Sequence, residues 1–170
     1  MRKKVRRSEW LGFLFVALAG TLLHFVYDWT GRSPLAAAFS AVNESTWEHM
    51  KLLFVPFFLF TMVQFVFFAE PLRNFLAAKT AALLLGLLTI PTLFYTLSGM
   101  FGETPAWVNI AIFYLADALC FLVSYQLLLR GALRRGAAQL AGFAVLWLLA
   151  FAFIYFTYRP PQLPLFLPPA

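Results

Sequence analysis

The sequence predicts an all-α membrane protein, a bundle of about five transmembrane helices with the N-terminus in the cytoplasm and the C-terminus outside. Its composition, its long apolar segments and the distribution of its basic residues all support this prediction. Of the 170 residues, 62% are hydrophobic and only 12% are charged, whereas a soluble domain carries roughly 25% charged residues. Too few charges remain to cover a surface in water, so lipid must surround much of the chain.

Five apolar segments are long enough to cross a bilayer as helices, which takes about 20 residues each. Helices are expected because backbone groups that face lipid must form their hydrogen bonds within the segment. The alternation of polar and apolar residues typical of a membrane barrel is absent. The spans lie at residues 10–29, 50–69, 79–98, 107–129 and 138–157 and form a single transmembrane domain over residues 1–158.

The basic residues predict the orientation, because Lys and Arg are enriched on the cytoplasmic side of a membrane. Ten of the 13 basic residues fall on the N-terminal side of the five-span model, and only Arg32, Lys51 and Arg159 fall on the other. The ten are Arg2, Lys3, Lys4, Arg6, Arg7, Arg73, Lys79, Arg130, Arg134 and Arg135. The basic residues lie between apolar runs, as membrane topology demands. The net charge of +6 therefore does not indicate nucleic-acid binding.

The two ends of the chain have distinct compositions. The basic N-terminus resembles a secretion signal, but the apolar run 10–29 exceeds the 7–15 residues typical of a signal core, so we expect an uncleaved first span. Residues 159–170 form a proline-rich outer tail that favours an extended conformation, with Leu163, Leu165, Phe166 and Leu167 resting on the membrane surface. Cys120 is the only cysteine, which excludes an intrachain disulfide.

Both histidines lie beside the first outer hairpin, together with several carboxylates. His24 and Asp28 are four residues apart on the first span, so they share a helix face. Glu44 and Glu48 are also four apart, and His49 follows directly before the second span. Two spans joined by a short loop are usually neighbours. We therefore expect these side chains to converge in one pocket near the outer face.

This combination of residues predicts a site for a divalent metal ion such as zinc. Histidine and carboxylate are common zinc ligands, and catalytic sites leave one position open for water. The predicted ligands are His24, Asp28, Glu48 and His49, and Glu44 and Glu48 are candidates for the general base. The spacing H-x-x-x-D followed by E-x-x-x-E-H is not an established zinc motif such as H-E-x-x-H.

A structural interpretation of the same residues is also open. The sequence Ser45-Thr46-Trp47-Glu48 fits a capping box, in which serine and glutamate bind the free amides at the start of a helix. Acidic residues are also favourable at the positive end of a helix dipole. In this interpretation Glu44 lies outside the helix, and Glu48 turns back to the backbone instead of facing a metal.

Asp117 lies near the middle of the fourth predicted span. An ionisable side chain at this depth is costly and commonly functional, and it faces the interior of a bundle. We expect Asp117 to have a polar partner on another span. We include it among the catalytic candidates as a residue that supports the metal ligands or couples to them. The alternative is a hydrogen-bond network that only holds spans together.

The hairpin resembles a known family. His24-Phe-Val-Tyr-Asp28-Trp, followed by Asn43-Glu44-Ser45-Thr-Trp-Glu48-His49, is similar to small bacterial integral membrane proteins of unknown function that share an N-E-S-x-W-E-H motif. This resemblance implies a bacterial cytoplasmic membrane and brings no activity with it. A looser similarity, to seven-span ceramidase-like hydrolases that hold zinc between helices, suggests only a class of reaction.

The leading functional hypothesis is a metal-dependent hydrolase or transferase of the cell membrane that acts on a lipid or lipid-linked substrate at the outer leaflet. The first alternative is a non-enzymatic module, such as a binder of small solutes, a carrier or a partner subunit. The second is a haem protein with His24 and His49 as the iron ligands.

Overall fold

The computed structural model describes residues 1–170 except 69, 71, 103–104 and 169–170. The described residues form helices and no strands, and five of the helices are long and apolar enough to cross a membrane. The predicted all-α fold is therefore confirmed. The long helices are α1 (Arg2–Trp29), α3 (Thr46–Phe68), α4 (Phe75–Phe101), α5 (Ala106–Arg130) and α6 (Gly136–Tyr158), and the short ones are α2 (Pro34–Ala37) and the 3-10 helix η1 (Pro164–Phe166).

The helices extend beyond the predicted spans at most of their ends. The largest difference is in α1, which begins at Arg2 rather than at Trp10. Lys and Arg are good helix formers, so the basic N-terminal segment continues the helix beyond the apolar run. The sequence did not predict α2, which begins at Pro34, a favourable residue for the first turn of a helix.

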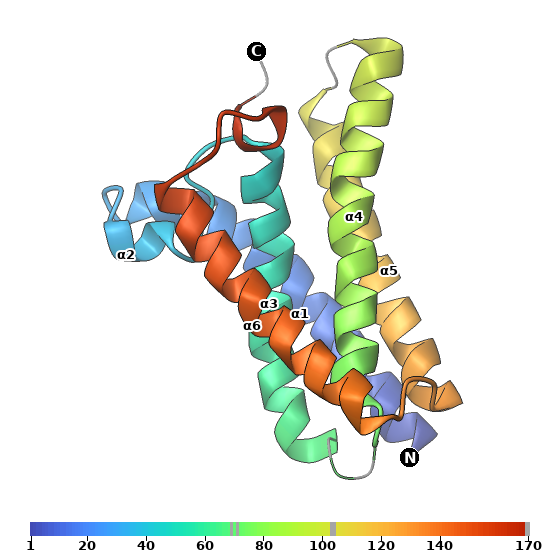
Figure 1. The fold of residues 1–170 in the computed structure, drawn as a ribbon. Helices are drawn as coiled ribbons and strands as arrows, with labels where there is room; N and C mark the ends of the chain where they lie inside the picture. Colours follow the sequence, from blue (N-terminus) through green and yellow to red (C-terminus); the bar gives the residue numbers. More distant parts are fainter. Residues whose placement is uncertain (69, 71, 103–104, 169–170) are drawn as a thin grey trace.

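Helix α3 is the centre of the bundle. It contacts α1, α4, α5 and α6, while α4 also packs along both α5 and α6. The two chain ends lie at opposite ends of the bundle, as an odd number of spans requires (Figure 1). We call the end that holds the N-terminus the N-terminal end, and the end that holds α2 and η1 the opposite end.

Gly20 allows α1 to approach α3 closely at the opposite end. A Cβ atom at this position would lie 2.7 Å from the backbone oxygen of Leu52 and 2.5 Å from the ring of Phe113. Such distances are far below van der Waals contact, so glycine is the residue that fits. The close approach matters for the site, because His24 lies one turn after Gly20 on α1.

Lys51 and Lys79, which lie at the ends of predicted spans, are both buried in ion pairs. Lys79 is fully buried, and its Nζ donates to both carboxylate oxygens of Glu9 at 2.7 and 2.8 Å. Gln64 adds a third hydrogen bond to Glu9, at 2.9 Å. The expectation that Lys79 lies between apolar runs is therefore wrong, because it lies within α4 and is buried in the bundle. These charges lie inside the bundle because each neutralises the other.

The remaining basic residues keep the uneven distribution that predicted the topology. Those exposed at the N-terminal end are Arg2, Lys3, Lys4, Arg6, Arg7, Arg73, Arg130, Arg134 and Arg135. Only Arg32 and Arg159 are exposed at the opposite end. The charge asymmetry thus remains after the buried lysines are removed from the comparison.

The tail after α6 folds back onto the bundle. Phe166 in η1 is only 9% exposed, and its ring centroid lies 4.8 Å from that of Trp47 on α3. Our expectation that Phe166 rests on the membrane surface is therefore wrong. Phe166 packs against the rings of both Trp47 and Phe156, and such aromatic pairs add to the stabilisation gained by burial.

Candidate metal site

Three side chains from separate parts of the chain meet at the opposite end of the bundle. His24 comes from the second half of α1, His49 from the first turn of α3, and Glu44 from the loop that precedes α3. The His24 Nε2 atom lies 3.6 Å from Glu44 Oε1, and the His49 Nε2 atom lies 3.5 Å from Glu44 Oε2. We refer to these residues as the His24–Glu44–His49 cluster.

The distances within the cluster suit a metal ion better than hydrogen bonds. One ligand atom from each residue can be chosen so that all three lie within 4.8 Å of one another. Ligands about 2.0 Å from a tetrahedral zinc ion lie roughly 3.3 Å from each other. The two histidine–glutamate distances are close to this value and longer than the 2.7–3.2 Å typical of hydrogen bonds.

The backbone of α3 orients the imidazole of His49. Its Nδ1 atom lies 3.0 Å from the carbonyl oxygen of Ser45. A carbonyl only accepts hydrogen bonds, so Nδ1 carries the proton. In the neutral ring the lone pair is then on Nε2, the atom that faces Glu44. Metal-binding histidines are commonly fixed in this way by a partner at the other ring nitrogen.

The loop before α3 holds Glu44 through local hydrogen bonds. The Asn43 side chain accepts a hydrogen bond of 2.8 Å from the backbone N–H of Ser45, which forms an Asx turn around Glu44. The Ser45 hydroxyl oxygen lies 3.4 Å from the Glu48 N–H, as a weak N-terminal cap. Glu44 therefore lies outside the helix, as the capping interpretation predicted, and still reaches both histidines.

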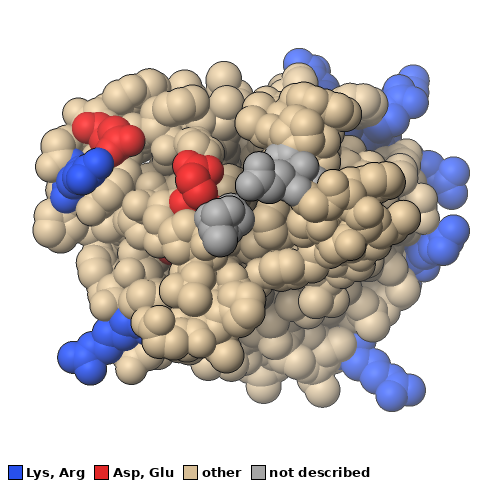
Figure 2. All heavy atoms as spheres, turned by 90° about the horizontal axis from the view of Figure 1, so that it is seen from above, with Lys and Arg blue, Asp and Glu red and all other residues tan. Residues whose placement is uncertain are grey.

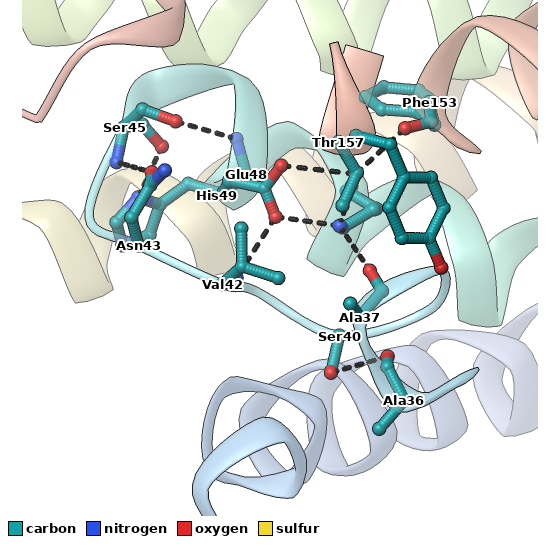
Figure 3. A network of polar contacts seen from close by, with 12 residues as sticks. Ala36, Ala37, Ser40, Val42, Asn43, Ser45, Glu48, His49, Phe153 and Thr157 are labelled. Carbon is teal, nitrogen blue, oxygen red and sulfur yellow. Dashed lines mark hydrogen bonds and ion pairs between the residues drawn. The ribbon is translucent and has the colours of Figure 1, made fainter. Parts of the chain in front are cut away.

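Glu48 does not face the cluster. Its carboxylate is buried and pairs with Lys51 Nζ at 2.6 Å, while it accepts hydrogen bonds from Val42 N–H and the Thr157 hydroxyl at 3.0 and 3.2 Å (Figure 3). The roles of metal ligand and general base predicted for Glu48 have no geometric support. Adjacent residues on a helix point in different directions, so Glu48 and His49 cannot both face α1.

Lys51 completes this buried network. Besides Glu48, its ammonium group donates to the Ala37 carbonyl oxygen at 2.8 Å and to the Thr157 hydroxyl at 2.7 Å. Lys51 thus joins α3 to α2 and to α6. All three of its protons have acceptors, so the network is structural: it fixes the loop that carries Glu44.

Asp28 also lies outside the cluster. Its side chain is 74% exposed, and it contacts the guanidinium group of Arg32 at 3.4 Å. Figure 2 looks onto this end of the molecule and shows acidic side chains in small separate patches on a largely uncharged surface. A carboxylate near the end of a helix can remain in water, which avoids the cost of burying it.

Asp117 is buried, as expected, but it lies away from the cluster. Its position on α5 is eight residues beyond Asn109, about 12 Å along the helix axis. Neither carboxylate oxygen has a hydrogen-bond partner among the residues that the structure describes. The polar partner that we expected on another span is therefore not found in this part of the chain.

Asn109 belongs to the site, and the sequence analysis missed it. It lines two cavities of about 400 and 230 Å³ that both border Glu44, His49 and Phe113. Its Oδ1 atom is buried and has no hydrogen-bond partner within the described residues. The signal was present in the sequence, because an amide inside an apolar span is unusual and commonly marks a contact between helices.

Comparison with protein families adds one finding. The model of a family described as "Family of unknown function (DUF6512)" matches residues 1–169. The chain belongs to the DUF6512 family. No curated protein and no solved structure matches the chain. The resemblance to an uncharacterised membrane protein family is thus confirmed, and the function of this DUF6512 protein must be argued from its own residues.

Proposed function

We propose that this DUF6512 protein binds one divalent metal ion, such as zinc, at the His24–Glu44–His49 cluster. The observation that carries the proposal is the placement of three ligand atoms within 4.8 Å of one another, although they come from three segments of the chain. The fixed ring of His49 supports it. Two histidines and one carboxylate are a ligand set of known catalytic zinc sites.

We further propose that the metal serves a hydrolase or transferase. Three protein ligands leave a coordination position for water or substrate, and a bound zinc ion supplies an acidic water at neutral pH. Glu44 is 64% exposed, so water reaches its carboxylate from outside the bundle. Asn109 also lines the cavity, where its amide can hold a polar group of the substrate.

The surroundings of the cluster favour a lipid or lipid-linked substrate. The cavity of about 400 Å³ is lined by residues of α1, α3 and α5, has mainly apolar walls, and is bordered by the cluster. Phe25 and Ile110 border it and are 48% and 56% exposed on the surface of α1 and α5. An amphiphile can therefore place its apolar part between the helices and its polar part beside the metal ligands.

The geometry does not favour haem as the ligand. A haem iron bound by two histidines has them on opposite faces of a flat porphyrin. Here the carboxylate of Glu44 lies within 3.6 Å of both Nε2 atoms, in the space that the porphyrin would need. A small cation needs far less space between these three groups, whose ligand atoms lie within 4.8 Å of one another.

Calorimetric titration of the purified, chelator-treated protein with Zn²⁺ tests the proposal. We expect one site per chain, lost in His24→Ala and His49→Ala and retained in Asp28→Asn, which removes a nearby carboxylate outside the cluster. Equal binding by all four proteins would refute the metal site. Zinc binding without cleavage of fluorogenic phospholipids or lipid esters would favour the non-enzymatic module over the hydrolase.

A further inference from the structure

A further cavity lies at the N-terminal end of the bundle, away from the proposed metal site. It measures about 360 Å³ and lies between the first turns of α1 and the second half of α5. The residues that line it are Arg6, Glu9, Trp10, Phe13, Ala118, Phe121, Leu122 and Tyr125. None of these residues belongs to the His24–Glu44–His49 cluster.

The walls of this cavity are apolar except for two charged side chains with different roles. Glu9 is neutralised by Lys79, which binds both of its carboxylate oxygens. Arg6 is exposed, and it forms no ion pair or hydrogen bond with the residues for which the structure gives a position. The cavity therefore combines an apolar groove with a cation, Arg6, that has no partner among the described residues.

The position of Arg6 along α1 suits contact with a lipid headgroup. It is one turn before Trp10, where the apolar part of α1 begins. Trp10 is 61% exposed, and together with Tyr125 it provides the aromatic residues that commonly lie at the membrane interface. An acyl chain that follows the groove from this point passes Phe13 and Leu122 toward the bilayer centre.

The charges around the cavity select the kind of lipid. Nine basic side chains are exposed at this end, and the only exposed acidic residue in the part of the chain described there is Glu70. Basic residues beside a membrane attract anionic lipids, each by about 1 kcal/mol. A zwitterionic headgroup gains less from this field, because it carries a positive charge of its own.

We propose that the groove between α1 and α5 is a binding site for an anionic phospholipid of the leaflet on the N-terminal side. Arg6 binds the phosphate group, and the side chains of Trp10, Phe13 and Leu122 hold one acyl chain. The site is independent of the proposed metal site, which lies at the other end of α1.

Native mass spectrometry of the full chain tests this site. The protein is delipidated in detergent and mixed with equal amounts of dioleoyl phosphatidylglycerol and dioleoyl phosphatidylcholine, which differ only in the headgroup. We expect preferential retention of phosphatidylglycerol. Arg6→Ala should reduce this preference by about fivefold, the equivalent of 1 kcal/mol, and Arg7→Ala, the matched control outside the cavity, by less than twofold.

A second variant tests the groove itself. Ala118→Phe places a ring in the cavity at an exposed position, so the fold should tolerate it. We expect it to reduce retention of both lipids. Equal effects of Arg6→Ala and Arg7→Ala would show that only the general positive charge attracts lipid and would overturn the proposal. Unchanged retention in Ala118→Phe would also overturn it.

Discussion

The Nδ1 atom of His49 lies 3.0 Å from the carbonyl oxygen of Ser45, and this contact directs the Nε2 atom of the same ring toward Glu44. The helix that carries His49 thus orients this proposed metal ligand. Glu44 is oriented by the preceding turn, and His24 by the close packing of α1 on α3. The cluster joins two helices and a loop, so a metal ion bound there links them.

Zinc should therefore stabilise the folded protein. A ligand that binds only the folded state at 100 times its Kd contributes about 2.7 kcal/mol. We expect thermal unfolding in detergent to shift upward when Zn²⁺ is added to chelator-treated protein. The His24→Ala variant should lose this shift, and Asp28→Asn should keep it. A shift of equal size in all three proteins would indicate zinc binding elsewhere.

The buried pair of Glu48 and Lys51 should contribute to stability and not to metal binding. Lys51→Met leaves the buried carboxylate without its cation, and breaking such a pair costs about 3–5 kcal/mol. We expect this variant to unfold at a clearly lower temperature. The double variant Glu48→Gln/Lys51→Met removes both charges and should recover much of the loss.

Zinc titration of the same double variant separates the two roles of Glu48. If Glu48 only fixes the loop, the folded double variant binds zinc nearly as tightly as the original protein. Loss of zinc binding in a variant that remains folded would instead indicate that Glu48 is a metal ligand.

Gly20→Ala should weaken both the fold and the site. The added Cβ would lie 2.7 Å from the Leu52 carbonyl oxygen, so α1 must move away from α3 and take His24 with it. We expect a lower unfolding temperature and weaker zinc binding. Gly99→Ala is the matched control, because its Cβ meets no atom within 4 Å. Alanine is the better helix former, so this control should be neutral or slightly stabilising.

The orientation in the membrane remains a prediction from the charge asymmetry. Reporter fusions after Trp29, Ala77, Gly102, Gly131 and Tyr158 should indicate outside, inside, outside, inside and outside in that order. The exposed basic residues concentrated at the N-terminal end are the physical reason. A cytoplasmic reporter after Tyr158 would contradict the orientation and would place the cluster on the inner side.

The sequence predicted the helices well because lipid imposes a simple rule. An apolar run of about 20 residues must be a helix, and all five predicted runs fall almost entirely within α1, α3, α4, α5 and α6. The meeting of His24 with Glu44 and His49 was also predictable. Their helices, α1 and α3, are successive spans in the chain, and successive elements commonly pack together.

The partners of the remaining charged residues were not predictable from local spacing. Glu48 binds Thr157, which is 109 residues away in the sequence, and Lys79 binds Glu9 across 70 residues. Such pairs depend on how the helices pack against each other. The spacing places Asp28 on the same helix face as His24. Asp28 lies near the end of the helix, however, where its carboxylate is exposed to water and contacts Arg32 instead of joining the cluster.

X-ray absorption spectroscopy of the zinc-loaded protein tests the central claim most directly. The account predicts two imidazole ligands and a shell of nitrogen and oxygen at about 2.0–2.2 Å. His49→Ala should reduce the count to one imidazole in whatever zinc remains bound. A sulfur ligand at about 2.3 Å, or an imidazole count unchanged in His49→Ala, would contradict a metal site at His24, Glu44 and His49.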